Sequence, residues 1–142
     1  MPYHILEPEV AGELGPNTEM DTSVHPPRVL RLHYELSDWL GDDLLESFPV
    51  FLASEPLAKE VAAHNLTGYA IVDAEVTLSP EAGELLGDQE VPRFYWLNVS
   101  GHPGVDDFGT TEKGHLVVSD RALAVLGSHR LNNCDVQDYP AT

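Results

Sequence analysis

The chain has 142 residues, 42% of them hydrophobic and 22% charged, which predicts one domain whose core is large enough to fold without disulfides. Twenty-four Asp and Glu residues face seven Lys and Arg residues, so the formal net charge is −17 at pH 7. A surface of this charge repels phosphates and anionic lipids, so we expect neither a nucleic acid nor a membrane as partner. A basic protein, by contrast, would be attracted and would associate quickly.

Cysteine content and hydropathy bear on the compartment. Cys134 is the only cysteine, so no disulfide can form within the chain, which favours a reducing environment. No apolar run approaches the roughly 18 residues that a membrane span needs. The first ten residues lack the basic and apolar regions of a secretion signal. We therefore expect a cytoplasmic protein.

The first third of the chain alternates between strand and loop signals. A strand is expected over residues 3–10, followed by a loop over residues 12–27 that is rich in Gly, Pro, Asn and Thr. Apolar and polar positions alternate in RVLRLHYEL, residues 28–36, which predicts a second strand. The acidic stretch SDWLGDDLLESF, residues 37–48, is expected to form a short helix or an acidic loop.

Two segments, residues 51–73 and 116–138, align without a gap. Each has a short apolar run, a serine, an acid, an amphipathic stretch, a His-x-Leu and a final run that ends in Asp. Internal repeats of this kind reveal the building unit of a fold. The serines, Ser54 and Ser119, are expected to end a strand and to cap a helix by accepting a backbone N–H bond. The sequence thus predicts two strand–helix–strand units, over about residues 50–73 and 115–138.

Other polar residues of these units also have structural explanations. Glu55 and Asp120 follow the serines, in the first helical turn, where the helix dipole favours negative charge. His64 and His129 fall at the two helix ends, where a histidine interacts favourably with the negative end of the dipole. Neither serine lies in the Gly-x-Ser-x-Gly turn of acyl-transfer hydrolases. We therefore expect these serines and histidines to be structural.

Two further strands, over residues 76–78 and 94–99, complete the prediction. Together with the two units they predict a single α+β or α/β domain over residues 1–142, with a central mixed sheet. No Gly/Ser-rich linker or change of composition divides the chain.

The segment GHPGVDDFGTTEKGH, residues 101–115, joins the strand at 94–99 to the second unit. Glycine and proline are typical of connections, so we expect a turn in which an aspartate caps local backbone N–H groups. The alternative is a metal site, because His and Asp side chains are ligands of divalent cations. The spacing matches neither a calcium-binding loop nor a His-Glu-x-x-His zinc helix, so we expect no bound metal. The ligands of the alternative site would be His102, Asp106, Asp107 and His115.

A second cluster of acids surrounds a tryptophan. Asp42, Asp43 and Glu46 follow Trp39 closely in the sequence, and an aromatic side chain with flanking acids suits the centre and rim of a protein interface. The alternative is that Trp39 belongs to the core and the acids to a solvated face. The partner-binding residues that we predict are Trp39, Asp42, Asp43, Glu46, Asp106 and Asp107.

Four short motifs lie between residues 48 and 139: Val118-Ser119-Asp120, Leu66-Thr67-Gly68, Tyr95-Trp96-Leu97 and Asp106-Asp107-Phe108-Gly109. With these motifs, which are a helix start, a turn, a strand and a loop, the chain resembles small acidic immunity proteins that are encoded beside bacterial polymorphic toxins. The resemblance implies binding and inhibition of a partner protein, with no catalysis and no required cofactor. It assigns no catalytic residue to this chain.

Functions of different classes follow from these observations. The first is a non-enzymatic, immunity-like protein that binds and neutralises a basic toxin or effector. The second is a small metal-dependent or acid–base enzyme that uses the loop over residues 102–115. A homodimeric scaffold of another role is a third alternative. We favour the first, and expect no enzymatic activity, because catalysis requires mutually positioned groups and the sequence shows no spacing that would supply them.

Overall fold

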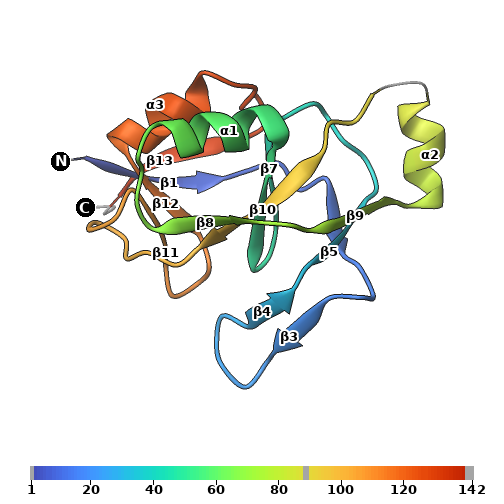
Figure 1. Cartoon of the computed structure of the whole chain (residues 1–142), viewed down its shortest axis with the longest axis horizontal. Coiled ribbons are helices and arrows are strands. Elements are labelled where there is room, and N and C mark those ends of the chain that lie inside the picture. The colour runs from blue at the N-terminus through green and yellow to red at the C-terminus, as the bar shows by residue number, and fades with distance from the viewer. Residues whose placement is uncertain (1, 88–89, 140–142) are drawn as a thin grey trace.

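The computed structural model describes residues 2–87 and 90–139 and shows a small α+β domain in which strands dominate (Figure 1). Within this part of the chain the helices are α1 (Glu55–Ala63), α2 (Pro80–Leu86) and α3 (Asp120–Gly127). The α+β class predicted from the sequence is confirmed.

Most strands belong to two four-stranded antiparallel sheets. The first contains β1 (Tyr3–Glu7), β11 (Phe108–Thr110), β12 (Leu116–Ser119) and β13 (Asp135–Tyr139), in the order β11-β12-β1-β13. The second contains β6 (Leu44–Ser47), β7 (Val50–Ser54), β8 (Tyr69–Val72) and β10 (Phe94–Val99), in the order β6-β7-β10-β8. In the first sheet, the central strand β1 comes from the N-terminal half of the chain and the other strands come from the C-terminal half. In the second sheet, the central strand β10 comes from the C-terminal half and the other strands come from earlier in the chain, so the two halves are interlocked.

Two smaller sheets complete the fold. β2 (Gly12–Leu14), β5 (His33–Leu36) and β9 (Glu75–Leu78) form a three-stranded sheet in which β5 and β9 run parallel. β3 (Glu19–Asp21) and β4 (Arg28–Arg31) form a hairpin that extends from the body of the domain (Figure 1). The expected single central mixed sheet is not confirmed, because the described strands divide among four sheets.

Local predictions for the first third need correction. The expected loop over residues 12–27 contains β2 and β3, and the predicted strand over residues 28–36 divides at Leu32, where the chain passes from the hairpin to the three-stranded sheet. Residues 37–48 contain no helix; their last part is β6, in which Leu44 and Leu45 are fully buried against β7. Pairing and burial here outweigh the acidic composition of the segment.

Helix α2 was not predicted, although its start carries the same signal as the other two. The hydroxyl of Ser79 accepts a hydrogen bond from the Ala82 N–H at 3.1 Å, and Pro80 occupies the first turn, where no intrahelical N–H bond is lost. The predicted strands over residues 76–78 and 94–99 are confirmed as β9 and β10.

The core has two apolar clusters, one on each face of the β6-β7-β10-β8 sheet, because neighbouring residues of a strand point to opposite faces. On one face, Phe51 packs with residues of α1, α3 and the β11-β12-β1-β13 sheet. On the other, Leu52 packs with Trp39, with α2 and with the three-stranded sheet. Burial on both faces explains why every residue of β7 is buried.

The two predicted units each pass through a strand, a helix and a strand: β7, α1, β8 and β12, α3, β13. Ser54 caps α1 by accepting a hydrogen bond from the Leu57 N–H at 3.4 Å, and Ser119 caps α3 in the same way at 3.1 Å, from the Ala122 N–H. Both serines are fully buried. The prediction that each serine ends a strand and starts a helix is confirmed.

Candidate functional site

Trp39 lies in the core. Its side chain is 7% exposed, packs edge-on against Phe94 with ring centroids 6.0 Å apart, and donates a hydrogen bond from Nε1 to the Asp42 carbonyl at 2.8 Å. The arrangement matches the alternative in which Trp39 is a core residue. Its predicted role at a partner interface stays a prediction.

Asp42 is 1% exposed and binds the loop that follows α3. Its carboxylate accepts hydrogen bonds from the backbone N–H groups of Asn132 at 3.0 Å and Asn133 at 2.7 Å, and from the Asn133 side chain at 3.2 Å. A buried carboxylate is tolerated where donors surround it. Asp42 therefore joins two segments that are far apart in the sequence.

Asp43 and Asp107 each connect a helix cap to the loop that follows the other helix. Asp43 accepts from the Ser54 hydroxyl at 2.6 Å and from the Arg130 N–H, beyond α3, at 2.8 Å. Asp107 accepts from the Ser119 hydroxyl at 2.6 Å and from the Thr67 N–H, beyond α1, at 2.9 Å. We call these two arrangements the Asp–Ser pairs.

Asp107 has a further donor in Arg121, whose Nη2 lies 2.9 Å from Oδ2. Burial opposes ionisation of Asp107, but the hydrogen bonds from Arg121, Ser119 and Thr67 outweigh burial and lower the pKa of this carboxyl. The carboxylate is held in its charged form by internal donors.

The alternative metal ligands of the loop do not converge. Asp106 accepts a hydrogen bond from the His102 N–H at 2.9 Å, which confirms an aspartate that caps local backbone N–H groups. Asp107 faces Ser119, and His115 lies near Glu7, with Nδ1 and Oε1 3.9 Å apart. Over residues 2–87 and 90–139, no group of three or more His, Cys, Asp or Glu side chains is placed to share a metal ion. The metal and acid–base alternative stays an untested prediction.

Glu46 is half-buried, and burial together with the nearby charge of Glu7 raises the pKa of its carboxyl to about 7. Burial, with the charges of Asp42 and Asp135, also raises the pKa of the Cys134 thiol to about 12, so this thiol is not a reactive thiolate. Sequence reasoning missed both effects, because they depend on residues that come together only in the fold.

Exposed acids lie on and beside β13, an edge strand of the β11-β12-β1-β13 sheet. Glu7, Asp135 and Asp138 are exposed, and the strands of this sheet contain no Lys or Arg. At the start of α3, Oδ1 of Asp120 lies 2.5 Å from Nε2 of His4. The other ring nitrogen of His4, Nδ1, lies 3.8 Å from Oδ1 of Asp138. We call Glu7, Asp120, Asp135 and Asp138 the β13 edge.

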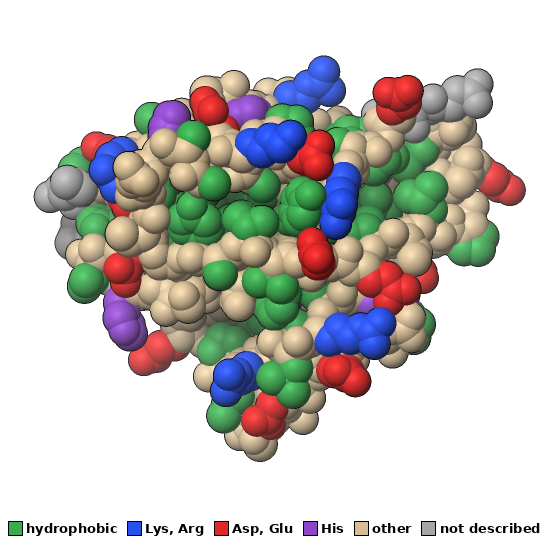
Figure 2. All heavy atoms as spheres, viewed as in Figure 1, with side chains coloured by type: hydrophobic (Ala, Val, Ile, Leu, Met, Phe, Trp, Pro, Cys, Tyr) green, Lys and Arg blue, Asp and Glu red, His purple; other side chains and the backbone are tan. Residues whose placement is uncertain are grey.

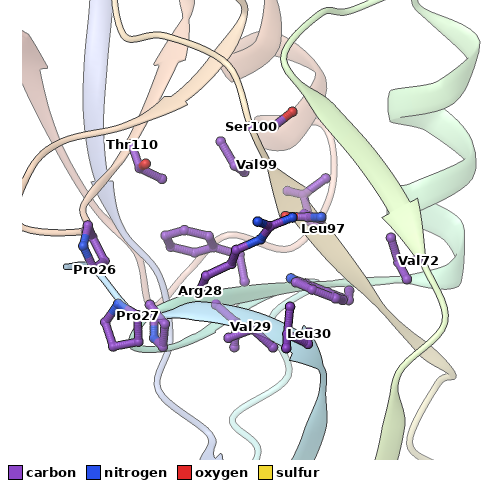
Figure 3. A pocket seen from close by; sticks show the side chains of 16 residues that line it. Pro26, Pro27, Arg28, Val29, Leu30, Val72, Leu97, Val99, Ser100 and Thr110 are labelled. Carbon is purple, nitrogen blue, oxygen red and sulfur yellow. The ribbon is translucent and has the colours of Figure 1, made fainter. Parts of the chain in front are cut away.

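A cavity of about 520 Å³ lies between the β3–β4 hairpin and the sheet that contains β10 (Figure 3). Figure 2 shows the surface hollowed between the body of the domain and the hairpin, with hydrophobic side chains in the hollow. Arg28 of β4 extends over the cavity, toward Leu97 of β10 (Figure 3). Sequence reasoning missed this cavity because its lining comes from separate segments, none of which carries a motif.

Comparison with known proteins found no family model that matches the chain, and no match among curated proteins. None of the described helices is long and apolar enough to cross a membrane.

The Asp–Ser pairs predict unequal costs for removing two helix caps. Ser119→Ala should lower the free energy of unfolding by about 3 kcal/mol, because it removes a cap worth about 1 kcal/mol and a hydrogen bond to an ionised carboxylate worth about 2 kcal/mol. Ser79→Ala should cost only about 1 kcal/mol, because Ser79 caps α2 without a carboxylate partner among the described residues. Urea unfolding of both variants measures the difference. Equal losses would contradict a role for the Asp107 bond.

The raised pKa of Glu46 predicts a pH-dependent stability. Because the folded carboxyl, with a pKa of about 7, keeps a proton that the unfolded chain releases near pH 4.5, stability should fall as pH rises from 5 to 8. Glu46→Gln should remove this fall and raise the free energy of unfolding at pH 8 by about 1 kcal/mol, since one pKa unit is worth about 1.4 kcal/mol and solvent screening reduces the effect of a half-exposed group.

Urea unfolding at several values between pH 5 and pH 8 gives the slope, and the exposed Glu13→Gln is the matched control. A Glu46→Gln slope equal to that of the unaltered protein would show that this carboxyl is not the group responsible.

Proposed function

We propose that this protein is a non-enzymatic binding protein, immunity-like in its mode of action, that holds and neutralises a basic partner protein in the cytoplasm. The observation that carries the proposal is the net charge of −17, with exposed acids at the β13 edge and no Lys or Arg in the strands of that sheet. A basic partner would be steered to such an edge, because complementary fields raise association rates.

The location of exposed charge favours the β13 edge over the acids nearest in sequence to Trp39. Asp42 is 1% exposed, and the carboxylates of Asp42 and Asp43 are engaged with backbone N–H groups. At the β13 edge, the Asp138 side chain is 96% exposed and that of Asp120 is 54% exposed. Side chains that reach this far into solvent can meet a partner without breaking the fold.

The resemblance to immunity proteins of polymorphic toxins supports the same function. It rests on the Val-Ser-Asp start of α3 and on the Asp-Asp-Phe-Gly loop, which is where the Asp107–Ser119 pair forms. In this proposal the motif maintains the binding scaffold and the variable charged surface selects the toxin or effector.

We further propose that the two strand–helix–strand units are repeats of one building unit. Their elements follow the same order, and each unit has an Asp–Ser pair at its helix start. The alignment of residues 51–73 with 116–138 then reflects a shared unit.

Charge reversal at the β13 edge tests the proposed function. Asp135→Lys with Asp138→Lys should slow association with the partner about tenfold or more at low salt and leave dissociation nearly unchanged, since screening acts over about 8 Å at physiological ionic strength. The partner is captured from a lysate of the source cell at low salt, and rates are measured by surface plasmon resonance from low to high salt.

Glu81→Lys with Glu84→Lys is the matched control: it makes the same change of charge on exposed residues of α2, at the other end of the molecule (Figure 1). Asp42→Lys with Asp43→Lys is unsuitable as a test, because it would remove the acceptors that hold residues 130–133. If the tightest partner associates equally fast at low and high salt, or if both double reversals slow it equally, the β13 edge does not steer binding.

A further inference from the structure

The cavity beneath the β3–β4 hairpin differs in charge from the rest of the molecule. Acids outnumber Lys and Arg by 24 to 7 in the chain, yet no Asp or Glu is among the described residues that line the cavity, and Arg28 is there. The described lining therefore carries one positive charge and no negative charge, in a protein that is acidic as a whole.

The Arg28 guanidinium is available to a ligand. Four of the other six basic side chains are in ion pairs: Arg31 with Glu75, Lys59 with Glu55, Arg93 with Asp73, and Arg121 with Asp107. Over residues 2–87 and 90–139, Arg28 makes no such ion pair.

The acid nearest along the hairpin is already engaged. Asp21 faces Arg28 across the hairpin, and hydrogen bonds from the hydroxyl and the N–H of Ser23 are the main causes that lower the pKa of its carboxyl, with a smaller effect of the Arg28 charge. The Arg28 side chain instead extends over the cavity (Figure 3).

The remaining lining is mostly apolar, with a few polar groups. Val29 and Leu30 of β4 lie on one side, and Val72 of β8 and Trp96 of β10 on the other. Polar side chains are supplied by Asn98, Ser100 and Thr110. Cavities of about 300–1,000 Å³ with apolar walls and a few polar groups are typical of small-molecule sites, and this one measures about 520 Å³.

An aromatic contact joins the hairpin loop to the body of the domain beside the cavity. Phe48 lies against His25 of the hairpin loop, with ring centroids 6.2 Å apart, and a Cβ on Gly114 would meet the Phe48 ring at 2.5 Å. Gly114 and the adjoining Pro26 and Pro49 line the cavity at this point. The hairpin loop thus contacts the body of the domain next to this part of the lining.

We propose that this cavity binds a small organic monoanion, a carboxylate joined to an apolar body. The planar guanidinium of Arg28 can bind a carboxylate in a bidentate geometry, through two parallel N–H···O hydrogen bonds. The valine, leucine and tryptophan side chains of the lining would contact the apolar part of the ligand. A single negative charge is preferred over a phosphate dianion, because the field of a protein with net charge −17 opposes each added negative charge. This site is independent of the partner proposed above and uses none of the β13 edge.

The test uses indole-3-butyrate and 4-phenylbutyrate, each beside its primary amide, with the full chain. Titrations followed by ¹H–¹⁵N NMR should give saturable shifts at the Asn98 side-chain amide and the Thr110 N–H, with a Kd on the order of 1 mM or below for the carboxylates. The amides should bind at least about tenfold more weakly than the carboxylates, because they lack the charge that meets Arg28.

Two matched variants assign the effect to one side chain. Arg28→Gln should weaken carboxylate binding about tenfold or more and remove the difference between acid and amide. Arg31 is on the same strand but outside the cavity lining, so Arg31→Gln removes the same charge without removing a contact to the ligand. The Kd of this variant should stay within about twofold of that of the unaltered protein, because only the small long-range effect of the charge is lost.

Several results would overturn the proposal. They are an absence of saturable shifts at cavity residues with both carboxylates, equal binding of acid and amide, unchanged binding in Arg28→Gln, and inorganic phosphate binding more tightly than either carboxylate. Melting curves confirm that both variants are folded, so a loss of binding reports on the site itself.

Discussion

The fold depends on two carboxylates, one buried and one partly buried, that each hold a serine cap and a distant loop together. Asp43 and Asp107 are engaged at once by the start of one helix and by the loop that follows the other. An ionised acceptor makes stronger hydrogen bonds than a neutral one, and an unsatisfied buried charge would be costly. Among the described residues no buried side-chain nitrogen or oxygen lacks a partner. The two Asp–Ser pairs therefore determine where α1 and α3 begin and how the interlocked halves meet.

This use of carboxylates changes the meaning of the net charge. Part of the acidity is internal: Asp42 is nearly fully buried, and its oxygens satisfy N–H groups of a loop that would otherwise be without acceptors. Another part is exposed, as at Asp138. Composition counts both kinds equally, although only exposed charges contribute strongly to steering a partner through solvent.

The same uneven distribution produces two surfaces of opposite character. The β13 edge combines exposed acids with strands that contain no Lys or Arg, whereas the cavity beneath the hairpin contains Arg28 and no acid among its described lining. In the two proposals made above, the acidic edge meets a basic protein and the pocket that contains Arg28 binds a small anion. The hairpin matters to the second surface only, since β4 supplies Arg28 and part of the apolar wall.

The sequence by itself determined the local elements whose signals lie within a few residues. Ser54 and Ser119 could be predicted as helix caps because the hydroxyl, the acid and the apolar face of each helix are neighbours in the chain. Only the tertiary structure decided which strands pair, where Trp39 lies and what the aspartates contact. Those outcomes depend on groups as distant as Asp42 and Asn133, whose contact is a property of the packed chain and leaves no periodic pattern in the sequence.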